Sequence, residues 1–74
     1  MRELLEAMAR ELVDDPERVR VEEWTEDGVV HLDLEVAPHD RGRVIGRQGR
    51  VAKAMRALLG VSRDGADCRL DIVD

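Results

Sequence analysis

Apolar residues recur at the spacing of a helix in the first part of the chain. The residues of this stripe follow one another at i, i+1, i+4 and i+8: Leu4, Leu5, Met8 and Leu12. Such a pattern is typical of an amphipathic helix that buries one face. Asp14-Asp15-Pro16 follows directly, and the residue before a proline is disfavoured in the helical region. We therefore predict a helix from Met1 to Val13.

The middle of the chain changes to the two-residue period of a β-strand. Val19 to Trp24 is predicted to form a short strand, and apolar residues alternate with polar ones from Val30 to Val36. Asp27-Gly28 lies between the two segments, and this dipeptide favours a two-residue hairpin turn. Trp24 is out of phase with the valines of its own strand, so it either caps the edge of the sheet or contacts a partner.

Two helices are predicted after the second strand. Asp40 is a favourable N-cap for a short helix through Ile45, and Gly46 is expected to end that helix. A longer helix is predicted over residues 49–59, with Gly60 as its terminator. Its apolar residues recur at helical spacing: Val51, Ala54, Met55, Leu58 and Leu59. Its basic residues lie on the opposite side: Arg50, Lys53 and Arg56.

A polar loop from Ser62 to Asp67 and a last strand complete the chain. Apolar residues alternate with polar ones in that strand: Cys68, Leu70 and Ile72. The chain is therefore expected to form one α+β domain, residues 1–74, with three helices packed on one face of a three-stranded sheet. A domain of 74 residues buries only about 60% of its unfolded surface. Its core must be aliphatic, because Trp24 is the only aromatic residue.

The charge of the chain is unevenly distributed. The net charge is −5, which by itself argues against a nucleic-acid partner. However, the window from Arg41 to Arg56 contains six basic residues and no acid, so the rest of the chain carries −11. A single basic patch on an acidic body would direct a polyanion to one face.

Cys68 is the only cysteine, so no internal disulfide can form, and a reducing cytoplasm is consistent with this. Acidic residues interrupt the first apolar run, which excludes a signal peptide there. No apolar run approaches the length of a membrane span. We expect a cytoplasmic protein without a membrane segment.

Glycine and arginine are concentrated between Arg41 and Arg50. This stretch, RGRVIGRQGR, contains four arginines, three glycines and no acidic residue. Gly46-Arg47-Gln48-Gly49 lies just before the predicted longer helix, whose first backbone N–H groups attract anions. Glycine permits a positive φ and a close approach of the backbone to a ligand. The stretch therefore favours binding of a phosphate-bearing polymer.

Residues 44–51, VIGRQGRV, resemble the V-I-G-x-x-G core of KH domains, in which the GxxG loop contacts the nucleic-acid backbone. The predicted order of elements is that of a type II KH domain, and the resemblance covers the whole chain. In its length the chain is similar to the small bacterial KhpA (YlqC-like) family of RNA-binding proteins. This resemblance implies an RNA chaperone or post-transcriptional regulator that grips single-stranded RNA.

The resemblance also assigns roles to the residues of the loop. Gly46 and Gly49 would let the backbone approach the RNA. Arg47 would supply charge and a guanidinium fork, and Gln48 would supply amide hydrogen bonds.

Residues beside the loop have less defined roles. Val44 and Ile45 would contribute either to the wall of a nucleotide-binding groove or to the core. Further phosphate contacts are expected from three basic residues: Arg43, Arg50 and Lys53. Because aromatic side chains are almost absent, no stacking platform is expected, and we predict modest affinity with weak sequence preference.

The family resemblance further implies a protein partner. Members of this family self-associate and pair with larger KH proteins of the KhpB/Jag kind, so a homodimer, a heterodimer or both are expected. A KH fold can also act mainly as a dimerisation module with little RNA binding of its own, because fold does not fix function. The basic Arg47 in the middle of the loop favours RNA binding over this alternative.

The sequence offers little support for an enzyme. Gly42 to Gly49 is not a P-loop, because no G-K-[ST] follows. His39-Asp40 supplies too few ligands for a metal phosphohydrolase, and His31 and Cys68 lie too far away to complete a site with the usual ligand spacing. We find no nucleophile with an adjacent base, and we expect no catalysis, cofactor or metal.

Overall fold

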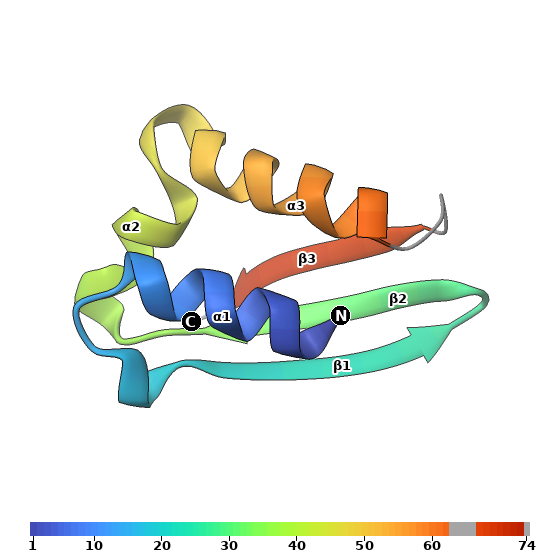
Figure 1. Cartoon of the computed structure of the whole chain (residues 1–74), viewed down its shortest axis with the longest axis horizontal. Coiled ribbons are helices and arrows are strands. Elements are labelled where there is room, and N and C mark those ends of the chain that lie inside the picture. The colour runs from blue at the N-terminus through green and yellow to red at the C-terminus, as the bar shows by residue number, and fades with distance from the viewer. Residues whose placement is uncertain (63–66, 74) are drawn as a thin grey trace.

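The computed structural model describes residues 1–62 and 67–73. The described residues form three α-helices and a three-stranded sheet, and Figure 1 shows how they are arranged. The elements in chain order are α1 (Arg2–Leu12), η1 (Pro16–Arg18), β1 (Arg20–Glu26), β2 (Val29–Glu35), η2 (Pro38–Asp40), α2 (Arg41–Ile45), η3 (Arg47–Gly49), α3 (Arg50–Ser62) and β3 (Cys68–Val73). The predicted α-β-β-α-α-β order is confirmed.

The sheet is mixed, with β2 in the centre. β1 pairs antiparallel with β2, and β2 pairs parallel with β3. Asp27 and Gly28 join β1 to β2 with φ angles of 53° and 76°, as a type I′ turn requires, which confirms the predicted hairpin. β1 runs two residues beyond the predicted end, because Glu26 still pairs with Val29 at the turn.

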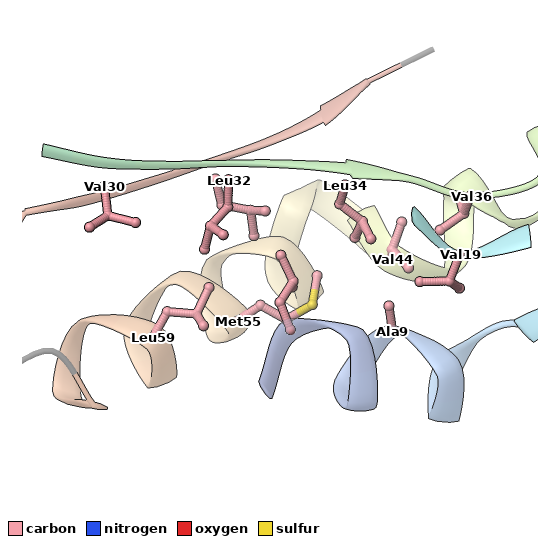
Figure 2. Packing of buried hydrophobic residues seen from close by; sticks show 11 residues of the cluster. Ala9, Val19, Val30, Leu32, Leu34, Val36, Val44, Met55 and Leu59 are labelled. Carbon is pink, nitrogen blue, oxygen red and sulfur yellow. The ribbon is translucent and has the colours of Figure 1, made fainter. Parts of the chain in front are cut away.

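The hydrophobic core lies between one face of the sheet and the helices (Figure 2). Alternate residues of β2 face it, and each helix contributes from one side. Its fully buried members include Leu5, Ala9, Val30, Leu32, Leu34, Val44 and Leu59. Truncating a leucine such as Leu32 at the centre of this core would cost about 2–5 kcal/mol.

The end of α3 differs from the sequence prediction. The helix continues through Gly60 to Ser62, so the prediction that Gly60 terminates it is wrong. A glycine inside a helix costs only about 1 kcal/mol, so Gly60 weakens the helix without ending it. Residues 63–66 of the predicted polar loop, and residue 74, lie outside the described part of the chain.

Arg56 connects α3 to the edge strand β3. Its Nε and Nη2 donate to the carbonyl oxygen of Leu70 at 3.3 and 2.9 Å. Edge strands present backbone groups that need partners, and the guanidinium satisfies one of them. The sequence pattern grouped Arg56 with Arg50 and Lys53 on a solvent face, but its guanidinium instead reaches the sheet.

Candidate nucleic-acid interface

The loop Gly46-Arg47-Gln48-Gly49 connects α2 to α3 by a tight turn. Gly46 ends α2 with φ 77° and ψ 169°, a conformation that is essentially restricted to glycine. Its N–H donates to the carbonyl of Gly42 at 2.9 Å, and the N–H of Gly49 donates to the carbonyl of Gly46 at 3.1 Å. The predicted break between the two helices is therefore present, and backbone hydrogen bonds hold it on both sides.

The two loop glycines are required for different physical reasons. A Cβ on Gly46 would lie 2.5 Å from Cγ2 of Val51 and 2.8 Å from its backbone nitrogen. Gly49 has φ 75°, but a Cβ there would meet no atom within 4 Å. Gly46 thus permits the close packing of α2 against the start of α3, whereas Gly49 supplies only a left-handed backbone conformation.

Gln48 adopts a left-handed conformation although it is not a glycine. Its φ and ψ are 56° and 25°, which costs about 1–2 kcal/mol for a residue with a Cβ. Nη2 of Arg50 donates to Oε1 of Gln48 over 3.4 Å. The conformation directs both middle residues of the loop, Arg47 and Gln48, into solvent.

The residues on either side of the loop separate into core and surface. Val44 is fully buried and belongs to the core, whereas the side chain of Ile45 is 40% exposed. Of these two residues, only Ile45 is therefore accessible to a ligand. Arg50 and Lys53, on the first turns of α3, are exposed and lie close in sequence to the loop.

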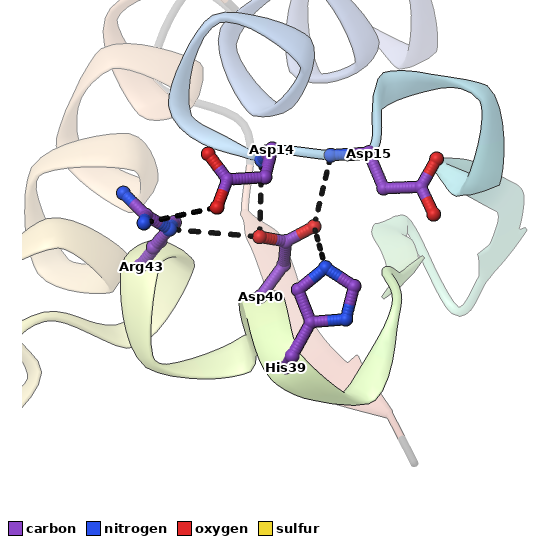
Figure 3. Close-up of polar contacts among 5 residues, drawn as sticks. All are labelled: Asp14, Asp15, His39, Asp40 and Arg43. Atoms are coloured by element: carbon purple, nitrogen blue, oxygen red, sulfur yellow. Dashed lines mark hydrogen bonds and ion pairs between the residues drawn. The ribbon is translucent and has the colours of Figure 1, made fainter.

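The guanidinium of Arg43 lies beside Asp14, at the end of α1 (Figure 3). Its Nη2 lies 3.0 Å from Oδ2 of Asp14, and its Nε lies 3.6 Å from Oδ1 of Asp40. The sequence prediction placed Arg43 among the phosphate contacts. In the structure, its charge is already compensated by two carboxylates.

Asp40 is the one fully buried charged residue among those described. Its Oδ1 accepts a hydrogen bond from the backbone N–H of Asp14 at 3.0 Å, and its Oδ2 accepts one from Asp15 at 3.1 Å (Figure 3). Asp40 holds the N-cap position of α2, as predicted, but its side chain makes no capping hydrogen bond to that helix. The carboxylate instead fixes the segment after α1, because two backbone N–H groups converge on it there.

The surroundings of Asp40 favour its charged form. Burial by itself raises the pKa of this carboxyl, but the N–H groups of Asp14 and Asp15, with His39 and Arg43, together hold its pKa below the usual value. Sequence reasoning missed this role, because an aspartate before a helix is also the signature of a local cap. The buried charge anchors α2, and with it the loop, to the end of α1.

An apolar pocket lies between α1 and α3. Its volume is about 340 Å³, and apart from Glu11 its lining is hydrophobic: Met8, Leu12, Val51, Ala54, Met55 and Leu58. Leu58 is 56% exposed and Leu12 is 36% exposed. The pocket begins near the loop, because Val51 also packs against Gly46.

Neither metal ligands nor membrane spans are found in residues 1–62 and 67–73. In these ranges no group of three or more His, Cys, Asp or Glu side chains could hold a metal ion. None of the helices described is long and apolar enough to cross a bilayer.

Comparison with known proteins identifies the family of this chain. The sequence model of the KhpA/KhpB KH domain matches residues 2–72. A protein named RNA-binding protein KhpA from Clostridium acetobutylicum is 51% identical over 59 residues, which cover 80% of this chain and 79% of the relative. A protein of the same name from Halalkalibacterium halodurans is 43% identical over the full length of both chains. The comparison with solved structures found no match. The chain therefore belongs to the KhpA/KhpB family of KH-domain proteins.

Proposed function

We propose that this protein binds single-stranded RNA by gripping its phosphate backbone with the Gly46–Gly49 loop. The observation that carries this proposal is the exposed Arg47, held in a glycine-dependent turn between two helices. The names of the relatives, RNA-binding protein KhpA, support the same conclusion. In this function the protein acts as an RNA chaperone or post-transcriptional regulator, without catalysis or cofactor, in the cytoplasm.

The charges around the loop explain how a protein with a net charge of −5 can attract RNA. Arg47 is exposed in the loop, and Arg50 and Lys53 are exposed on the adjoining turns of α3. Acidic residues elsewhere repel the polyanion, so they orient it toward this patch. Ile45 offers an exposed apolar contact beside the loop, which suits the face or edge of a base.

The proposal is tested by replacing both middle residues of the loop, Arg47→Asp and Gln48→Asp. Aspartate tolerates left-handed φ better than most residues, so the backbone at position 48 can keep its conformation. We expect a melting temperature within about 3 °C of the wild type, because both side chains are exposed. Binding to a short single-stranded RNA should be lost, since two carboxylates would face the phosphates.

The salt dependence of binding gives a second measure. If Arg47, Arg50 and Lys53 each neutralise one phosphate of a single strand, the plot of log K against log salt has a slope near roughly −2. Unchanged RNA affinity in the doubly substituted loop, with the fold intact, would instead favour the alternative that the domain serves mainly as a protein-interaction module.

We also propose that the protein dimerises through the apolar pocket between α1 and α3. A second copy related by a two-fold axis would place α1 of one copy against α3 of the other. The exposed Leu58 of each copy would then fill the pocket of its partner.

Light scattering of Leu58→Glu tests the dimer. Leu58 is largely exposed, so this change should leave the monomer folded and abolish self-association. The matched control is Leu4→Glu, at an exposed leucine of α1 outside the lining of the pocket. A wild-type protein that stays monomeric at high concentration would contradict the homodimer and leave a KhpB-type protein, which the family name suggests, as the partner.

A further inference from the structure

The sheet has a second face, turned away from the three helices, and it carries the only aromatic residue of the chain. Along β1 and β2, the residues of this face alternate with the residues of the face that covers the core. We call six of its residues the outer sheet patch: Glu22, Trp24, Glu26, His31, Asp33 and Asp71. Each is exposed or half-buried.

Trp24 forms the apolar centre of the outer sheet patch. It pairs with His31 across the hairpin, and the two rings stack with centroids 5.1 Å apart and an interplanar angle of 8°. One side of the indole therefore rests on His31, yet the residue remains 38% exposed. Glu22 and Glu26 flank Trp24 on the same face of β1, because they are two residues away in either direction.

A row of three carboxylates crosses the sheet beside Trp24. Glu22 pairs with Asp33, and Asp33 pairs with Asp71, so the row contains one acid from each strand. Like charges in directly opposed positions destabilise a sheet. Two arginines share this face of the sheet: Arg69 lies opposite His31 and Arg20 lies opposite Glu35. The two arginines compensate part of the negative charge, but five carboxylates share this face of the sheet, so it stays acidic: Glu22, Glu26, Asp33, Glu35 and Asp71.

We propose that the outer sheet patch binds an arginine- or lysine-bearing segment of a partner protein. A guanidinium placed over the open side of Trp24 gains a cation–π interaction, and the carboxylates of Glu22 and Asp33 offer a fork for its N–H groups. Tryptophan is also one of the residues enriched among the hot spots of protein–protein interfaces. The negative charge of the patch disfavours a nucleic acid there.

The patch faces away from α2 and α3, which carry the RNA-binding loop. A basic partner could therefore bind while RNA occupies the loop. The inference does not depend on the proposed RNA binding, because the acids and the tryptophan of the patch play no part in it.

Trp24 provides a direct test, because it is the only tryptophan and its fluorescence reports on the patch alone. We would titrate the full chain with a tetra-arginine peptide and, as a control, with a tetraglutamate peptide. We expect a saturable change in emission with tetra-arginine only, weakened at high salt as screening predicts. The change should persist in the loop variant Arg47→Asp/Gln48→Asp.

A charge-neutral variant, Glu22→Gln/Asp33→Asn/Asp71→Asn, completes the experiment. Binding of tetra-arginine should weaken about tenfold or more, because three screened charge interactions are lost. A cooperative thermal transition near the melting temperature of the wild type shows that the fold of this variant is intact. A linear, non-saturating quench, or affinity that is unchanged in the neutral variant, would overturn the proposal. It would also be overturned if single-stranded RNA changed Trp24 emission in the Arg47→Asp/Gln48→Asp variant, which would indicate a base-stacking platform.

Discussion

Oδ1 of Asp40 lies 3.0 Å from the backbone nitrogen of Asp14, 26 residues earlier in the chain. This hydrogen bond, with that from Asp15, joins the end of α1 to the start of α2. Because α2 leads directly into the Gly46–Gly49 loop, the position of the loop depends on hydrogen bonds between two segments that are far apart in the sequence.

Asp40→Asn should destabilise the protein at neutral pH. The amide can accept from one of the two N–H groups, but its own NH₂ then opposes the other, which leaves a buried donor unsatisfied. We expect the melting temperature to fall by about 5 °C or more. Asp14→Asn is the control: it keeps the backbone N–H and loses only an exposed ion pair with Arg43, so its effect should be small. Equal stability of Asp40→Asn and the wild type would contradict this role.

The carboxyl group of Asp40 also predicts how the stability of the protein depends on pH in acid. The pKa of Asp40 is lower in the folded protein than its usual value. Its contribution to the stability of the fold is therefore fully present above the unfolded pKa of about 3.9. The contribution is lost as the pH falls through the lower folded pKa. Melting temperatures measured from about pH 7 down to pH 2.5 should therefore show the wild type losing its advantage over Asp40→Asn only below about pH 4. An advantage that disappears between pH 7 and 5 would show that another group is responsible.

Alanine at three glycines should separate steric from backbone effects around the loop. Gly46→Ala should cost about 3 kcal/mol or more, because the new Cβ meets Val51 in a conformation that other residues avoid. Gly49→Ala should cost about 1–2 kcal/mol from its positive φ alone. Gly42→Ala should be neutral or stabilising by up to about 1 kcal/mol, since it lies in a helix with open space around it. Chemical denaturation gives all three values, and similar costs at positions 46 and 49 would refute the steric explanation.

The parts of this fold that the sequence predicts are those set by local chemistry. Asp27-Gly28 specifies its turn through its own φ preferences, and the apolar stripe of residues 2–12 specifies a helix by its period. Gly60 has the local signature of a helix terminator, but a glycine costs a helix only about 1 kcal/mol, and α3 continues through it to Ser62. Asp40 holds the N-cap position that its local signature predicts, but its carboxylate accepts from the N–H groups of Asp14 and Asp15 and not from α2. No local pattern reveals these N–H groups, because they belong to a distant segment.

Arg56→Ala should loosen the contact between α3 and β3. Two N–H groups of the guanidinium donate to the carbonyl of Leu70, and a charged donor to a partly buried acceptor contributes about 1–2 kcal/mol. Lys53→Ala, on the same helix and also exposed, is the matched control and should change the free energy of unfolding by no more than about 0.5 kcal/mol. If both variants lose the same stability, helix propensity and not the Leu70 contact explains the loss.

Arg43 and Arg50 should differ in their effect on RNA binding, although both flank the loop, Arg43 three residues before Gly46 and Arg50 directly after Gly49. Arg43 is paired with Asp14 and Asp40, so a phosphate would have to compete with two carboxylates for its guanidinium. Arg50 contacts only the neutral amide of Gln48 among the interactions described for it. We therefore expect Arg50→Gln to reduce the magnitude of the salt slope by about 0.7, the value for one phosphate of a single strand. Arg43→Gln should leave the slope unchanged and instead lower the melting temperature. A slope that falls equally in both variants would show that RNA draws Arg43 away from its carboxylates, and would restore it to the phosphate contacts predicted from the sequence.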